Sequence, residues 1–134
     1  MTHMCVGALL IQSGKILLGR RSRNRAFYPN VWDVFGGHIE AAETAEEALI
    51  RELKEEIGVE PTEWSYLDSI TAKTGEAVVE CRFYVVTAWH GEPTNRQQEE
   101  HELIEWFSIE SAQSLQLADP GYPSLFSLAR ARTG

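Results

Sequence analysis

The stretch that decides the fold is residues 37–59, GHIEAAETAEEALIRELKEEIGV. Its apolar side chains recur every four positions, which is the spacing of one helix face. These side chains are Ala45, Leu49, Leu53 and Ile57. Thr44 and Glu47 form a capping-box pattern before the run, and Gly58 supplies a stop after it. The stretch therefore predicts an amphipathic helix with defined ends.

The same part of the chain carries most of the charge. Residues 40–63 contain nine Glu and two basic residues, a local balance of −7 in a chain of formal net charge −8. Glu52, Glu55 and Glu56 share one face of the predicted helix, where like charges repel by about 0.2–0.5 kcal/mol a pair. Clustered carboxylate oxygens suit a hard cation such as Mg²⁺ or Mn²⁺. On this spacing alone, a solvated acidic helix face is the simpler interpretation.

The pattern around these carboxylates is far more specific than their spacing. It reads G-x5-E-x7-R-E-U-x-E-E-x-G-U, where U is a bulky aliphatic residue. Its fixed positions are filled by Gly37, Glu43, Arg51, Glu52, Leu53, Glu55, Glu56, Gly58 and Val59. This pattern is the Nudix box. The chain therefore resembles the Nudix hydrolases, including the MutT-type nucleotide pyrophosphohydrolases.

Three segments outside the box are similar to the same family. They are WDVFGG at 32–37, EEHELIEWF at 99–107 and LADPGY at 117–122. Many members have Pro where this chain has Phe35. The resemblance implies one Nudix hydrolase domain over residues 1–134, with an α/β fold. That fold is an α-β-α sandwich, in which a mixed β-sheet lies between helices.

The order of apolar runs along the chain agrees with a mixed sheet. Strands are predicted at 4–11, 15–19, 31–35, 64–72, 77–89 and 103–109, and a terminal helix at 122–132. The turn signal Gln12-Ser13-Gly14 joins the first two strands as a hairpin. Strands that flank one helix and finish with another favour a sheet covered by helices.

The resemblance implies a metal-dependent catalytic site built on the box. Glu55 and Glu56 are expected to bind a divalent metal ion, Mg²⁺ or alternatively Mn²⁺, with the backbone carbonyl of Gly36 as a further ligand. Glu52 is expected either to bind metal or to orient and deprotonate the attacking water. Glu56 and Glu52 are therefore the catalytic carboxylates, and which one is the general base stays open. Glu100 is the expected ligand from a later acidic loop.

Supporting roles are expected for other charged residues. Arg51, the third catalytic residue, is expected to hold the carboxylates in place, because Glu47 and Glu55 lie four residues to either side. Glu43 would support the junction between the loop and the helix. Glu99 and Glu102 are close alternatives to the chosen ligand in the later loop.

Candidate substrate contacts precede the box. The basic candidates are Arg20, Arg21 and Arg23. They would either grip terminal phosphates or form a solvated loop that balances an acidic protein. The aromatic candidates are Tyr28 and Trp32, with Phe27 beside them. These would either stack on a base or pack in the core.

Composition excludes several classes of protein. The length of 134 residues and the 43% hydrophobic content fit one folded domain. The net charge disfavours a nucleic-acid polymer or an anionic membrane as partner. No apolar run reaches the roughly 20 residues of a membrane span, and no signal peptide is visible. Cys5 and Cys81 are expected to be reduced core residues of a cytoplasmic protein, with a disulfide as the alternative. A homodimer stays open.

The expected activity is Mg²⁺-dependent hydrolysis of a nucleoside diphosphate linked to another group. The preferred substrates are nucleoside triphosphates, oxidised ones included, cleaved to a monophosphate and pyrophosphate. The alternative enzyme is an ADP-ribose or nucleotide-sugar pyrophosphatase. The alternative of another class is a nucleotide-sensing Nudix module without turnover, although its usual mark, a broken box, is absent from residues 37–59.

Overall fold

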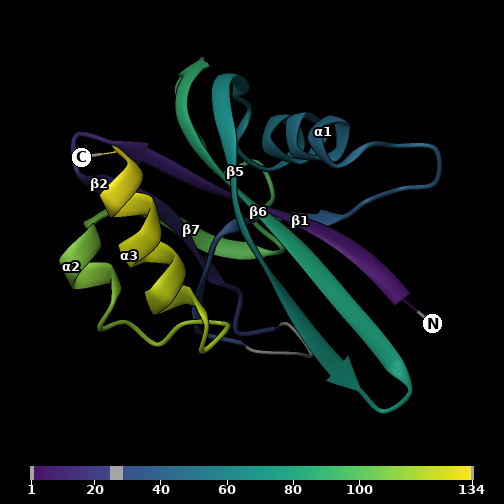
Figure 1. Ribbon diagram of the computed structural model, residues 1–134. Coiled ribbons are helices and arrows are strands. Elements are labelled where there is room, and N and C mark those ends of the chain that lie inside the picture. The colour runs from purple at the N-terminus through teal and green to yellow at the C-terminus, as the bar shows by residue number, and fades with distance from the viewer. Residues whose placement is uncertain (1, 25–28, 134) are drawn as a thin grey trace.

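A mixed β-sheet forms the centre of the protein, as a computed structural model of residues 2–24 and 29–133 shows (Figure 1). The strands in this part of the chain are β1 (Thr2–Gln12), β2 (Lys15–Arg21), β3 (Trp32–Asp33), β4 (Phe35–His38), β5 (Glu60–Thr74), β6 (Ala77–His90) and β7 (His101–Ser108). The main order across the sheet is β3-β2-β1-β6-β5, with β4 paired to β1 and β7 paired to β2. Strands β1 and β6 run parallel, and the other pairs are antiparallel.

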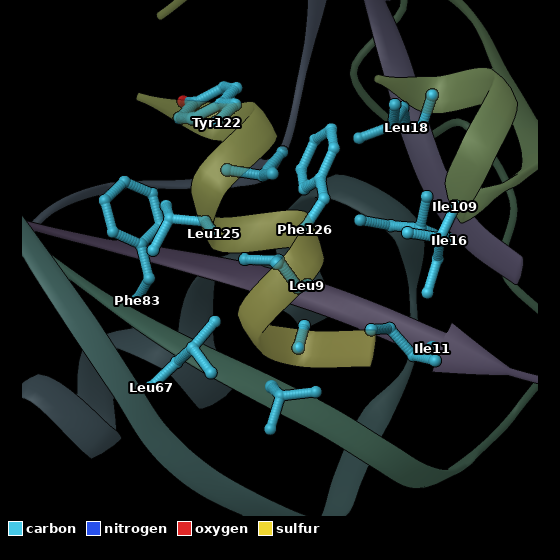
Figure 2. Packing of buried hydrophobic residues seen from close by; sticks show 14 residues of the cluster. Leu9, Ile11, Ile16, Leu18, Leu67, Phe83, Ile109, Tyr122, Leu125 and Phe126 are labelled. Carbon is cyan, nitrogen blue, oxygen red and sulfur yellow. The ribbon is translucent and has the colours of Figure 1, made fainter. Parts of the chain in front are cut away.

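Helices cover both faces of this sheet. They are α1 (Ala45–Ile57), α2 (Ile109–Ala112) and α3 (Tyr122–Thr133). Strand β1 alternates between the two faces: Val6, Ala8 and Leu10 pack with α1, while Leu9 and Ile11 pack with α3. Figure 2 shows the core between the sheet and α3, where Phe126 of α3 lies over the sheet. The predicted α-β-α sandwich with a mixed sheet is confirmed.

The local signals of the predicted helix are present in α1. The Thr44 hydroxyl accepts from the Glu47 amide at 3.1 Å, and the Glu47 carboxylate accepts from the Thr44 amide at 2.9 Å. Gly58 ends the helix in the left-handed conformation, with φ at 71°, and its amide donates to the Lys54 carbonyl. These caps fix where α1 begins and ends.

Two details differ from the sequence expectation. The single strand predicted at 31–35 is two strands, because β3 pairs with β2 while β4 pairs with β1. The strand predicted at 103–109 ends at Ser108, whose side chain instead caps the short helix α2. No helix in residues 2–24 and 29–133 has the length and apolar character required to cross a membrane.

Candidate active site

A cavity of about 450 Å³ lies where α1 faces β4 and the start of β7. Charged and polar side chains gather on this part of its wall: Arg51, Glu52, Glu56, Glu100 and His101. A second part of the wall comes from β1, β3, β6 and the start of α3, and includes Cys5, Asp33, Cys81, Phe83 and Tyr122. The cavity is therefore acidic at the helix and more apolar away from it.

Glu56 is the most deeply buried carboxylate of the site, with 3% of its surface exposed. One of its oxygens accepts from the Gly36 amide at 2.8 Å, and the other lies 3.4 Å from Nε2 of His101. Burial is the main cause that raises the pKa of Glu56 to about 9, and the charges of Glu52 and Glu100 contribute in the same direction. Without a cation, this carboxyl group therefore holds a proton at neutral pH.

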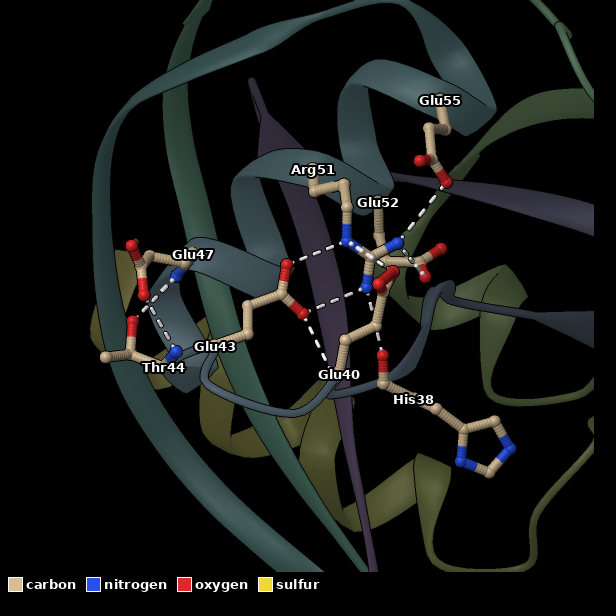
Figure 3. A network of polar contacts seen from close by, with 8 residues as sticks. All are labelled: His38, Glu40, Glu43, Thr44, Glu47, Arg51, Glu52 and Glu55. Carbon is tan, nitrogen blue, oxygen red and sulfur yellow. Dashed lines mark hydrogen bonds and ion pairs between the residues drawn. The ribbon is translucent and has the colours of Figure 1, made fainter.

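Arg51 organises the carboxylates along the exposed edge of the site (Figure 3). Its guanidinium donates to Glu43 at 2.8 Å, to Glu52 at 2.9 Å and to Glu55 at 3.3 Å. It also donates to the His38 carbonyl at 3.0 Å. The hydrogen bond from Arg51 lowers the pKa of Glu43. Arg51 thus ties the loop before α1 to the helix.

The expected contact between Arg51 and Glu47 is wrong. The Glu47 carboxylate is bound to the Thr44 amide in the capping box, so it points to the start of the helix (Figure 3). Glu43 takes its place, because the loop before α1 folds back over the helix and also bonds the Glu40 amide to Glu43. This arrangement agrees with the expectation that Glu43 supports the junction between loop and helix.

Two glycines of β4 let the carboxylates approach the backbone. Gly36 has φ at 155°, and a Cβ there would collide with the backbone of Val6 on the neighbouring strand. A Cβ on Gly37 would lie 2.6 Å from Oε1 of Glu52. Any larger residue at 37 would therefore displace the Glu52 carboxylate.

The carboxylates of α1 occupy different environments. Glu52 and Glu56 are one turn apart and both line the cavity. Burial raises the pKa of Glu52, against the opposite effect of Arg51. Glu55 has 51% of its side chain exposed, bonds to Arg51 and lies outside the cavity lining. The structure therefore brings together two of the three carboxylates predicted on α1.

A set of donor atoms at the acidic end of the cavity fits a divalent cation. One ligand atom each from Glu56, Glu100 and His101 lies within 4.8 Å of the other two. Carboxylate oxygens are suited to Mg²⁺ and Mn²⁺, whereas an imidazole nitrogen is a ligand typical of later transition-metal ions. Among the rivals in the later loop, Glu100 lines the cavity, whereas Glu99 and Glu102 do not.

The predicted substrate contacts are spread over several environments. Arg21 lines the cavity and forms an ion pair with Asp33 at 3.1 Å. Arg20 and Arg23 lie 3.8 Å and 3.9 Å from Glu102, outside the lining. Trp32 packs edge-on against Phe107 in the core, with ring centroids 4.8 Å apart. Tyr28 and Phe27 lie outside the described residues.

Asp33 and Tyr122, like His101, belong to the cavity wall but were not among the site residues predicted from the sequence. The Tyr122 hydroxyl donates to Asp33 at 2.6 Å, across a wide separation in sequence. Burial raises the pKa of Asp33, although Tyr122 and Arg21 both bond to its carboxylate. The stretch 117–122 resembled the family, but nothing in its composition singled out a contact with β3.

Comparison with known proteins identifies this arrangement. The NUDIX domain profile matches residues 1–128. The chain belongs to the Nudix family. The CTP pyrophosphohydrolase of Escherichia coli strain K12 is 32% identical over 120 residues, which cover 90% of this chain and 86% of that protein. The 8-oxo-dGTP diphosphatase of the same strain is 31% identical over 107 residues, or 80% of each protein.

Solved structures agree with the Nudix assignment. The solution structure of the Escherichia coli ORF135 protein superposes with a TM-score of 0.83 at 30% identity, and the match covers 98% of this chain and 91% of that one. The crystal structure of a MutT Nudix hydrolase from Burkholderia pseudomallei matches the fold with a TM-score of 0.79. The resemblance inferred from the box is confirmed, and this Nudix chain is a hydrolase by family.

Proposed function

We propose that the protein hydrolyses nucleoside triphosphates, oxidised ones included, to a nucleoside monophosphate and pyrophosphate with Mg²⁺ as cofactor. The observation that carries this proposal is the buried carboxylate of Glu56, facing Glu100 and His101 in a cavity that also holds Glu52. The names of the relatives support a triphosphate substrate, since they are a CTP pyrophosphohydrolase and an 8-oxo-dGTP diphosphatase. An ADP-ribose or nucleotide-sugar substrate is not favoured by these relatives.

The proposed ligands of the ion are Glu52, Glu55, Glu56, Glu100 and the carbonyl of Gly36. A bound divalent ion neutralises phosphoryl oxygens and lowers the pKa of water. Glu56 must release its proton to act as a ligand, because burial raises its pKa to about 9. Glu55 must exchange its bond to Arg51 for the ion, since its carboxylate lies on that guanidinium at 3.3 Å.

The remaining residues of the box would orient these groups. Glu52 is proposed either to bind the ion or to accept the proton from the attacking water, because it lines the cavity while Arg51 holds one of its oxygens at 2.9 Å. His101 and the Gly36 amide fix the two oxygens of Glu56 at 3.4 Å and 2.8 Å. These contacts set the direction of the carboxylates before any substrate enters.

The proposed phosphate contact is Arg21, which lines the cavity. Arg20 and Arg23 are proposed to contribute positive charge near the cavity, and Tyr28 to contact the base. Trp32 was the other aromatic candidate, but its packing against Phe107 favours the core alternative. We further propose that residues 1–134 form a single Nudix domain that works in the cytoplasm, free of nucleic acid and membrane, with a homodimer as a further option.

A hydrolysis screen with Mg²⁺ tests the activity. The substrates are nucleoside triphosphates, oxidised nucleotides, ADP-ribose, nucleotide sugars and dinucleoside polyphosphates, with Glu56→Gln as the matched inactive variant. We expect monophosphate and pyrophosphate from triphosphates, and in heavy-oxygen water the label in a phosphate product. Hydrolysis of ADP-ribose alone would support the alternative enzyme, and binding without turnover would support a sensing module.

A further inference from the structure

The two cysteines of the chain are direct neighbours in the sheet, although they are far apart in sequence. Cys5 of β1 and Cys81 of β6 are paired residues in the parallel register of these strands. Paired residues of adjacent strands place their side chains on the same face. Both residues line the cavity described above, and both thiols are free. The sequence treated them as separate core residues, because nothing in it relates position 5 to position 81.

The surroundings of the two thiols are unequal. The sulfur of Cys5 lies 3.5 Å from Nδ1 of His38 on the neighbouring strand β4. The hydrogen bond with Cys81 lowers the pKa of the Cys5 thiol, and the nearby His38 acts in the same direction. Cys81 is more enclosed, since it packs against the core under α3. Cys5 is therefore placed to react first and Cys81 to react second.

We propose that Cys5 and Cys81 form a reversible thiol–disulfide pair in the wall of the active-site cavity, closed by a hydroperoxide. In the first step, the Cys5 sulfur attacks the peroxide oxygen, which breaks the O–O bond and gives a sulfenic acid and one water or alcohol. In the second step, the Cys81 sulfur attacks the Cys5 sulfur, and the hydroxyl leaves as water. Two thiols and one hydroperoxide thus give one disulfide, and the two electrons lost by the sulfurs reduce the peroxide.

Strand geometry allows this bond and makes it reducible. Neighbouring strands lie about 4.7–4.9 Å apart, which falls within the roughly 4.4–6.8 Å range of Cα separations in disulfides. The Cβ atoms of paired residues in parallel strands are nearly as far apart as the strands, so the bond requires a local twist. Disulfides that are strained or exposed are the labile ones. A switch is therefore a better description of this pair than a structural crosslink.

Closure of the disulfide would alter the cavity. Cys5 would turn from His38 toward Cys81, and β1 would be drawn against β6 two residues from Gly7, which pairs with Gly36. Neither thiol belongs to the carboxylate cluster of Glu56, Glu100 and His101. We therefore expect oxidation to raise the KM for nucleotide several-fold and to change metal binding less, because Gly36 is the one proposed ligand on a strand paired with β1. This consequence, unlike the disulfide itself, rests on the proposed function.

The test is oxidation of the metal-free, full-length protein with dilute hydrogen peroxide, followed by thiol titration and peptide mapping. We expect loss of both thiols, loss of two hydrogen atoms in mass, a crosslink between the peptides of Cys5 and Cys81, and recovery with dithiothreitol. Thiols that survive peroxide, or a disulfide that joins two chains, would overturn the proposal. The wild-type protein suffices for this measurement, so no variant has to fold.

Two variants test which cysteine reacts first. In Cys81→Ser, the sulfenic acid on Cys5 should persist and be trapped by dimedone, whereas Cys5→Ser should give no adduct under the same conditions. Equal trapping in both variants would overturn the assigned order. A non-hydrolysable nucleotide analogue with Mg²⁺ should slow closure in the wild type. If the disulfide forms at an unchanged rate in its presence, the thiol pair stands and the nucleotide does not occupy this cavity.

Discussion

Replacement of Glu56 by Gln should stabilise the metal-free protein, although it removes a residue of the active site. The side chain is 3% exposed and its carboxyl group has a pKa of about 9, compared with an ordinary value of 4.5. At pH 7 the folded protein therefore keeps the proton, whereas the unfolded chain has lost it. Gln resembles the protonated carboxyl group, since each offers one acceptor to the Gly36 amide and one donor toward His101.

The size of the effect follows from linkage between folding and proton binding. A carboxyl group with a raised pKa favours folding below its unfolded pKa, and this contribution is lost as pH rises toward the folded value. Between pH 4.5 and pH 7, at about 1.4 kcal/mol for each pH unit, the loss approaches about 3 kcal/mol. Relaxation of the neighbouring carboxylates reduces this figure, so we expect metal-free Glu56→Gln to exceed the wild type by about 1–3 kcal/mol at pH 7.

The measurement is urea unfolding of both proteins in EDTA at several pH values from 5 to 8. The matched control is Glu55→Gln, which removes the same charge from the neighbouring, half-exposed position and should change stability by less than about 0.5 kcal/mol. Added Mg²⁺ should reverse the order, since an ion at about 100 times its Kd stabilises the wild type by about 2.7 kcal/mol. Ion binding should also tighten as pH rises, because Glu56 must release its proton.

Two results would refute this reasoning. If metal-free Glu56→Gln is less stable than the wild type at pH 7, the carboxylate is ionised and belongs to a structural ion pair. If the difference between the two proteins does not change with pH, protonation of Glu56 is not its cause. Equal stabilisation of both proteins by Mg²⁺ would show that Glu56 is not a ligand.

Three further substitutions test other parts of the site. His101→Ala should weaken Mn²⁺ binding by about 10–100-fold in titrations followed by electron paramagnetic resonance, and His101→Gln should restore part of the lost affinity. An equal loss of affinity in both variants would indicate direct ligation by the imidazole. Gly37→Ala should lower kcat with little change in melting temperature, because its Cβ meets Glu52 at 2.6 Å; normal kcat would contradict the assigned role of that carboxylate. Tyr122→Phe should cost about 1.5–3 kcal/mol in urea unfolding, because Asp33 loses a donor at 2.6 Å; an unchanged midpoint would show that this bond contributes nothing.

The parts of the site that sequence could predict depend on local signals. The caps at Thr44 and Gly58 and the four-residue spacing between them determine α1, and α1 in turn brings Glu52 and Glu56 to one face. The capping-box pattern also argued against the expected contact between Glu47 and Arg51. A capping box occupies the carboxylate of Glu47, so that side chain is not available to a residue four positions later.

The parts that sequence could not predict depend on pairing between distant strands. His101 faces Glu56 only because the ladder between β2 and β7 slips by one residue: Arg20 pairs with Leu103, and Arg21 pairs with His101. Ile104 lies on the face of the sheet that packs against α1. Regular alternation along β7 would therefore have placed residue 102, and not residue 101, on the same face. The bulge instead places His101 on this face, beside Gly19 of β2. A Cβ on Gly19 would lie 2.8 Å from the His101 ring.

The same bulge links the acidic end of the cavity to the basic loop before the box. Residue 102 is the extra residue of β7, and its carboxylate accepts from the Arg23 amide at 3.1 Å and lies 3.8 Å from Arg20. One irregular position thus brings His101 to the carboxylate cluster and holds two of the arginines that sequence alone left as either phosphate contacts or a solvated loop. A single residue slip between strands far apart in the chain has no local signature. The spacing of EEHELIEWF therefore indicated an acidic loop at the site, with Glu100 in the cavity wall, but gave no sign that His101 would enter the cavity beside it.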